Sequence, residues 1–130
     1  MIKYGFGKTV VMPFTVAIES VILALQNEGF GILTNIDVAE VLKKKLNQDM
    51  PPYRILGACN PILANRAIAA EPSVGLLLPC NVVVREDGAG LVHVEFMDTN
   101  VIMNLVEKQE IAQLANEVFA KLEKVMAAIA

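Results

Sequence analysis

Two Cys-Asn dipeptides, Cys59-Asn60 and Cys80-Asn81, are the residues of this sequence whose types best suit chemistry. Asn favours the N-cap of a helix and Pro its first turn, so Pro61 after the first dipeptide predicts a helix that begins directly after Cys59. Free backbone N–H groups and the positive end of the helix dipole favour a thiolate or a bound anion at such a place. The alternative is that Cys59 is a small apolar side chain of the core.

The second dipeptide follows Pro79 within an apolar stretch. Because proline cannot donate a ladder hydrogen bond, we expect a bulge or a sheet edge there, which would turn Cys80 out of the regular alternation. Asn81, if buried, needs hydrogen-bond partners from a loop or a ligand. The candidate ligand-binding residues are therefore Cys59, Asn60, Cys80 and Asn81. A core role for each thiol stays open.

A catalytic role for these thiols would need a base within reach. The only histidine, His93, lies on the strand expected to pair with the strand that carries Cys80, and some registers would bring the two together. The groups that could contribute to a metal site are Cys59, Cys80, His93, Glu95 and Asp98. No pair of them has the close spacing typical of a zinc motif, so the sequence assigns no metal and no cofactor.

The elements that must position these residues indicate an α+β fold. Apolar residues recur at helical spacing after Pro13, and Asp37 stands three residues before Glu40, as in a capping box. The turn at Asp87-Gly88 predicts a hairpin. The expected strands are 1–12, 30–36, 53–58, 74–85 and 91–97, and the expected helices are 14–25, 38–46, 62–70, 99–104 and 107–128. The order β-α-β-(α)-β-(α)-β-β-α favours a mainly antiparallel sheet with helices packed on one face.

Length and composition narrow the class further. The chain has 130 residues, which predicts a single domain over 1–130. Its hydrophobic content of 55% exceeds the usual value of roughly 45–50%, and a homodimer interface is the expected destination of the excess.

The same composition argues against several partners. No apolar run approaches the roughly 20 residues that cross a bilayer, and the beginning of the chain lacks a signal-peptide core. A net charge of −3 with mixed signs gives no basic surface for nucleic acid. Two cysteines without a disulfide framework are expected to be free thiols, and we expect a cytoplasmic location.

Three segments carry a resemblance to a known family: GFGILTNID at 29–37, YRILGACNP at 53–61 and GLLLPCNV at 75–82. In this order and spacing the chain resembles the domain-of-unknown-function family 302, and the Cys-Asn-Pro and Pro-Cys-Asn segments are the most specific parts. The resemblance implies a small α+β domain with helices on one face of an antiparallel sheet, and a homodimer. It implies no established activity, but it places both dipeptides in the hallmark stretches of the family.

Three functions therefore remain open from the sequence. The first is a dimeric module that binds a small anionic or thiol-reactive ligand near the two Cys-Asn segments. The second is a cysteine-dependent redox or thiol enzyme. The third is a structural or protein-interaction module without a ligand, for which the apolar excess argues.

Overall fold

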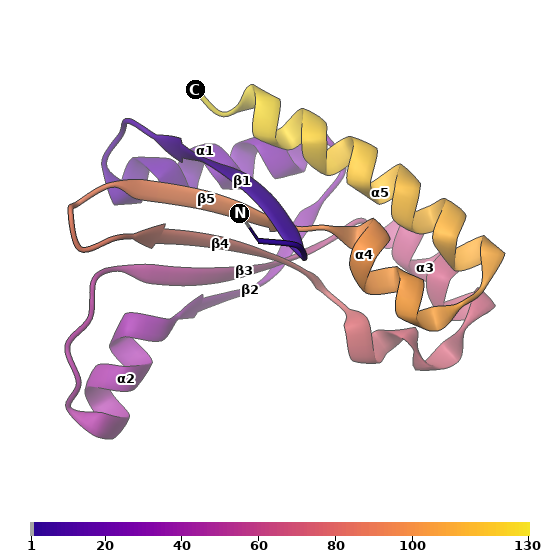
Figure 1. The fold of residues 1–130 in the computed structure, drawn as a ribbon, viewed down its shortest axis with the longest axis horizontal. Coiled ribbons are helices and arrows are strands. Elements are labelled where there is room, and N and C mark those ends of the chain that lie inside the picture. Colours follow the sequence, from indigo (N-terminus) through magenta and orange to yellow (C-terminus); the bar gives the residue numbers. More distant parts are fainter. Residues whose placement is uncertain (1) are drawn as a thin grey trace.

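The centre of the molecule is a five-stranded antiparallel sheet with the strand order β1-β5-β4-β3-β2 (Figure 1). The computed structural model describes residues 2–130, so the expected strand start at Met1 lies outside the described residues. The strands are β1 Gly5–Val10, β2 Gly31–Asp37, β3 Tyr53–Cys59, β4 Cys80–Glu86 and β5 Val92–Met97. The α+β class and the antiparallel sheet expected from the sequence are confirmed.

Helices lie on one face of this sheet and at its two ends (Figure 1). The α-helices are α1 Phe14–Asn27, α2 Val38–Leu46, α3 Pro61–Ala70, α4 Thr99–Met103 and α5 Gln109–Ala128, and the 3-10 helices are η1 Pro72–Leu77 and η2 Asn104–Val106. The long helix α5 runs from the end where α3 and α4 lie back across the sheet to α1, while α2 lies at the opposite end. One end of the sheet is therefore covered by α3, α4 and part of α5, and the other end carries α2.

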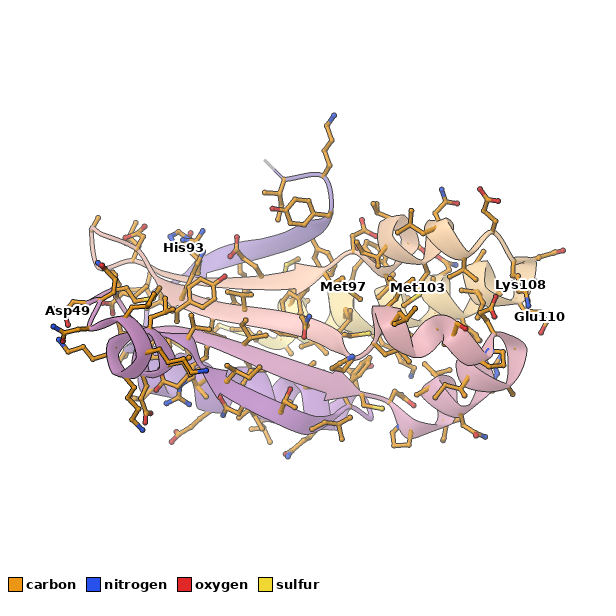
Figure 2. All side chains as sticks on the ribbon, turned by 90° about the horizontal axis from the view of Figure 1, so that it is seen from below. Asp49, His93, Met97, Met103, Lys108 and Glu110 are labelled. Carbon is orange, nitrogen blue, oxygen red and sulfur yellow. The ribbon has the colours of Figure 1, made fainter. Side chains whose placement is uncertain are left out.

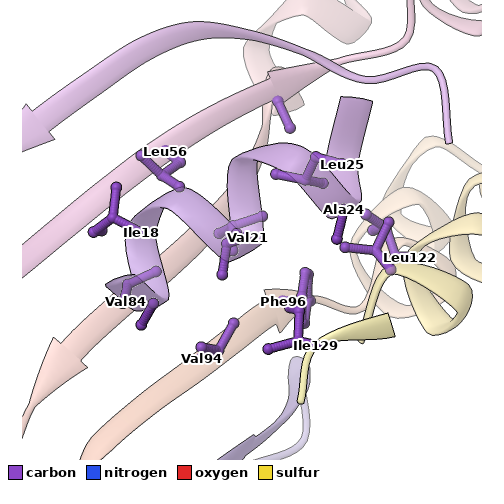
Figure 3. Close-up of a cluster of buried hydrophobic side chains, with 14 of the residues drawn as sticks. Ile18, Val21, Ala24, Leu25, Leu56, Val84, Val94, Phe96, Leu122 and Ile129 are labelled. Atoms are coloured by element: carbon purple, nitrogen blue, oxygen red, sulfur yellow. The ribbon is translucent and has the colours of Figure 1, made fainter. Parts of the chain in front are cut away.

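The main core lies between the sheet and the pair α1 and α5 (Figure 3). Alternate residues of each strand point to this face, because successive side chains of a strand point to opposite sides. Buried side chains from the strands and the two helices include Leu56, Val84, Phe96, Leu25 and Leu122. Each such side chain contributes about 1.5–3 kcal/mol by leaving water, so this core fixes the platform on which both ends are built.

A second, smaller cluster holds α3, α4 and the first half of α5 together beyond the end of the sheet. Its buried members are Leu63, Val74, Met103, Ile111, Leu114 and Ala115. Val118 of α5 packs against both clusters and joins them. This end of the molecule is thus built mostly from helices, and the end of β3 and the beginning of β4 lie beside them.

The expected helix starts are confirmed by their caps. Asp37 Oδ1 accepts a hydrogen bond from the backbone N–H of Glu40 at 3.0 Å, and Asp98 Oδ1 accepts one from Asn100 at 3.0 Å. Gly29 has a φ of +85°, the left-handed conformation that ends α1. Short-range rules thus suffice to place these three boundaries.

The segment 74–85, expected as one long strand, is divided in the structure. Residues Pro72–Leu77 form the 3-10 helix η1, and the strand β4 begins only at Cys80. Pro79 has no N–H to donate to a ladder, and Pro72 suits the first turn of a helix, so the apolar run is split at its prolines. The strand that carries Cys80 therefore starts at the cysteine itself.

The edge strand β2 contains a bulge. Ile32 pairs with Ala58 and Thr34 pairs with Gly57, which leaves Leu33 as one extra residue opposite β3. Leu33 therefore leaves the regular alternation of its strand.

Candidate functional site

An apolar cavity of about 270 Å³ lies where the sheet meets α3, α4 and α5. The sheet side is formed by the end of β3 and the beginning of β4, and α3, α4 and α5 line much of the rest. Residues that line it include Ala58, Cys59, Asn60, Leu63, Ala67, Cys80, Thr99, Met103, Ile111 and Leu114. Figure 2 shows Met103 among these helices, at the end of the molecule opposite His93. The cavity wall is almost wholly apolar.

Antiparallel pairing brings the two cysteines to this cavity from distant parts of the chain. Cys59 is the last residue of β3 and Cys80 the first of β4, and Ala58 pairs directly with Cys80. Among residues 2–130, neither cysteine takes part in a disulfide. The structure therefore brings Cys59, Asn60 and Cys80 together along one cavity wall.

Cys80 is a buried and protonated thiol. Only 7% of the residue is exposed, and this burial raises the pKa of the Cys80 thiol to about 11, with the nearby Cys59 adding to the shift. A thiol that holds its proton so firmly is a poor nucleophile at neutral pH, because the thiolate is the reactive form. At this wall Cys80 acts as a small, polarisable apolar surface.

Asn60 caps α3, as the sequence predicts. Its Oδ1 accepts a hydrogen bond from the backbone N–H of Leu63 at 3.3 Å, and Pro61 in the first turn has no N–H. A Cβ at Gly29 would lie 3.1 Å from Asn60 Nδ2, so this amide packs closely over the end of α1. Capping and proline together reduce the donors that α3 offers to an anion.

Asn81 does not belong to the cavity. It is exposed and pairs with Gly57, and it follows Cys80 directly, so its side chain points to the other face of the sheet. The sequence predicts partners for the Asn81 amide only if it is buried. Because it is exposed, it can hydrogen-bond to water instead. Asn81 is the one candidate ligand residue that the fold separates from the other three.

Thr99 is a cavity residue that the sequence did not single out. The residue is only 1% exposed, and its Oγ1 donates a hydrogen bond to the backbone carbonyl of Ala115 at 2.7 Å. Asp98 before it predicts a helix start, but no local signal shows that the next side chain faces α5. The hydroxyl ties α4 to α5 and is satisfied inside the protein.

His93 lies far from the thiols. The register of β4 and β5 pairs His93 with Arg85, at the hairpin end of the sheet, so no contact with Cys80 forms. Within the part of the chain that the structure describes, no three His, Cys, Asp or Glu residues lie close enough to hold a metal ion. None of the helices between residues 2 and 130 is long and apolar enough to cross a membrane.

Sheet, helices and cavity define an α+β domain with an apolar pocket at the helical end of an antiparallel sheet. The chain belongs to the family described as "Domain of unknown function DUF302", whose model matches residues 6–129. This confirms the resemblance noted in the sequence. No curated protein matches the chain significantly.

The fold also matches a solved structure. It is similar to the crystal structure of an uncharacterized conserved protein DUF302 from Bacillus stearothermophilus, with a TM-score of 0.92 and 24% sequence identity. The match covers 99% of this chain and 100% of that chain. At this identity the likeness shows that the two proteins share a fold.

Proposed function

We propose that this protein is a binding module for a small, uncharged and largely apolar molecule, held in the cavity between β3, β4, α3 and α5. The observation that carries the proposal is the cavity itself, about 270 Å³ with an almost wholly apolar wall. An engineered cavity of about 150 Å³ in another protein stays dry and binds benzene. The larger volume here suits a molecule of about two fused rings, or an aliphatic group of similar size.

The rim of the cavity supports access for such a molecule. Leu33 of β2 and Ile68 of α3 both line the cavity, yet they are 67% and 47% exposed. Large apolar side chains that reach both solvent and cavity mark an opening between the edge strand and α3. An apolar molecule would gain from contact with them before it enters.

The anionic ligand expected from the sequence has less support. Pro61 and the Asn60 cap occupy the start of α3, and the cavity-lining residues in the described chain include no Lys, Arg or His. A charged ligand would lose its hydration without an opposite charge in return. A thiol-reactive ligand fits the site only through Cys59, since Cys80 holds its proton.

A binding experiment tests this proposal with naphthalene as the probe. Saturable shifts in two-dimensional NMR spectra, confined to the residues that line the cavity on β3, β4, α3, α4, α5 and the rim, are the expected result. Ala67→Phe places a ring in the cavity and is expected to abolish the shifts. Ala69→Phe, at an exposed position of the same helix outside the cavity lining, is the matched control and should bind as the natural chain does.

Two outcomes would contradict the proposal. One is the absence of saturable binding to the natural chain, and the other is equal binding by both variants. Binding of 2-naphthoate, measured beside that of naphthalene, compares a charged ligand with an uncharged one of the same ring size. Tighter binding of the carboxylate would favour the anionic ligand expected from the sequence over an uncharged one.

We propose further that the domain works as a homodimer in the cytoplasm, where thiols stay reduced. Support comes from large apolar side chains left on the surface, such as Leu76, Ile62 and Leu105 around the helical end. Surfaces of this kind are commonly covered in assemblies. Light scattering after gel filtration gives the mass directly, and a monomer at micromolar concentration would contradict this second proposal.

A further inference from the structure

A chain of hydrogen bonds links a hydroxyl, an imidazole and a carboxylate at the hairpin end of the sheet. Thr9 Oγ1 lies 3.0 Å from His93 Nδ1, and His93 Nε2 lies 2.7 Å from Asp87 Oδ2. Figure 2 shows His93 at this end, well away from Met103, which lines the cavity. The arrangement has the order of groups found in nucleophilic hydroxyl–histidine–carboxylate centres.

The fold holds all three groups in place. Thr9 pairs directly with His93 across β1 and β5, so the two side chains share one face of the sheet. Asp87 lies in the turn between β4 and β5, and its Oδ1 accepts hydrogen bonds from the backbone N–H groups of Ala89 and Leu91 at 2.9 and 3.0 Å. The carboxylate is thus oriented by the backbone, with Oδ2 left for the imidazole.

The carboxylate determines the tautomer of the imidazole. The hydrogen bond from His93, and then that from the Leu91 N–H, lowers the pKa of Asp87 below its ordinary value, so this carboxylate is ionised and can only accept. His93 Nε2 must therefore donate. In the neutral imidazole Nδ1 is then an acceptor, and it faces the hydroxyl proton of Thr9.

The other charged groups around His93 are engaged elsewhere. Arg85, opposite His93 on β4, pairs through Nε with Glu95 Oε1 at 2.8 Å. Lys8, next to Thr9 on β1, donates to the backbone carbonyl of Ile129 at the end of α5. Asp87 is therefore the carboxylate that contacts the imidazole within the described chain.

A substrate has room beside Thr9. A shallow hollow of about 460 Å³ adjoins the hydroxyl and His93, and Gly5 and Gly7 of β1 form part of its floor. β1 is an edge strand, and an edge presents unpaired backbone N–H groups. Such donors can stabilise the oxyanion of an acyl-transfer intermediate.

We propose that Thr9, His93 and Asp87 form an acyl-transfer centre that hydrolyses small esters. Thr9 Oγ attacks the ester carbonyl carbon while its proton passes to His93 Nδ1. The bond to the leaving oxygen breaks, and the alcohol departs with that proton, leaving an acyl ester on Thr9. Water then attacks this ester, gives a proton to His93 and releases the acid, and the proton returns to Thr9.

The test uses 4-nitrophenyl acetate with the full chain. Release of 4-nitrophenol and an acetyl group on Thr9, located by peptide mass spectrometry, are the expected results. Thr9→Val removes the nucleophile and is expected to lower the rate about 10²-fold or more, whereas Thr9→Ser retains it. Thr34→Val, at an exposed threonine of the other edge strand, is the matched control and should leave the rate unchanged.

Asp87 is a positioning residue, and its test needs a second readout. Asp87→Asn keeps an oxygen for the Ala89 and Leu91 N–H groups but removes the charge beside the imidazole. We expect a lower rate and a pH profile displaced to lower pH, because the imidazolium loses its counter-charge. A loosened turn alone would lower the rate without displacing the profile.

The proposal is wrong if Thr9→Val, shown to be folded by circular dichroism, hydrolyses the ester as fast as the natural chain. It is equally wrong if the acetyl group is found only on lysines, if Thr34→Val loses as much activity as Thr9→Val, or if the profile of Asp87→Asn is not displaced.

Discussion

Strand β4 connects two unlike environments. At its first residue, Cys80 lies in an apolar wall, and burial raises the pKa of its thiol. Directly after its last residue, Asp87 lies in a turn, and hydrogen bonds from His93 and the backbone lower the pKa of its carboxyl. Burial keeps one group neutral and hydrogen bonding keeps the other charged. The two ends of one strand therefore hold their titratable groups in opposite states, a protonated thiol in an apolar wall and an ionised carboxylate in a turn.

Polar groups are satisfied differently at the two ends. At the cavity end the buried hydroxyl of Thr99 is satisfied by a backbone carbonyl of α5. At the hairpin end, half-buried side chains satisfy one another, as Arg85 does with Glu95. A dry site tolerates few polar groups and fixes each one, whereas a wetter face can hold a connected set of charges.

The largest expected effect comes from the helical end. Leu114→Ala removes a buried side chain of the second cluster and is expected to lower the free energy of unfolding by about 2–5 kcal/mol. Urea denaturation measures it. Leu46→Ala, at a residue of α2 that is 69% exposed, is the control and should change stability by no more than about 0.5 kcal/mol. Equal losses would mean that the cluster does not hold this end together.

The thiol of Cys80 predicts a loss of stability in alkali. The unfolded chain releases this proton near the ordinary pKa of 9.0, whereas the folded chain keeps it until about 11. The folded state binds more protons between these values, so stability falls as the pH rises through them, by about 2–3 kcal/mol in total.

Urea denaturation from pH 8 to pH 11 checks this slope. Lysines and tyrosines also titrate there, so the comparison with Cys80→Ala is the informative one. The variant is expected to be less stable at pH 8 and to lose less stability above pH 9. Parallel curves for the two chains would contradict the assignment of the slope to Cys80.

A smaller effect is expected at Thr99. Thr99→Val keeps the shape of the side chain but removes the hydrogen bond to the Ala115 carbonyl, at a cost of about 1 kcal/mol. Thermal unfolding monitored by circular dichroism measures the change. An unchanged midpoint would show that the link between α4 and α5 does not depend on this hydroxyl.

The smallest effect belongs to Asp87 in acid. Because its pKa in the folded state lies below the ordinary value of 3.8, the stability that it provides is present above that value and is lost as the pH falls further. Asp87→Asn should make the stability less dependent on pH below about 4. His93→Gln removes the main cause of the shift and is expected to weaken the same dependence.

The sequence could predict what depends on neighbours along the chain. The caps at Asp37, Asn60 and Asp98 and the turn at Gly29 follow from short-range rules, and each is present. Even the departure of Asn81 from the site follows from alternation, once Cys80 is known to face the helices. Pro79 predicts an interruption of the apolar stretch 74–85, but not that its first part forms a 3-10 helix.

What the sequence could not supply depends on register and on distant packing. That Cys59 and Cys80 share a wall follows from the pairing of Ala58 with Cys80, which no local pattern specifies. The hydrogen bond of Thr9 to His93 joins residues 84 positions apart. Thr99 meets α5 only because α4 folds back onto it, so its burial is a property of the assembled helices.

The bulge at Leu33 also bears on strand addition at the exposed edge of the sheet. An edge strand with exposed apolar side chains is a template on which another chain can add a strand. The extra residue at Leu33 interrupts the even spacing of backbone groups on β2, so an incoming strand cannot stay in register along it. The residue that lies at the cavity rim is thus also the one that makes this edge a poor template for another strand.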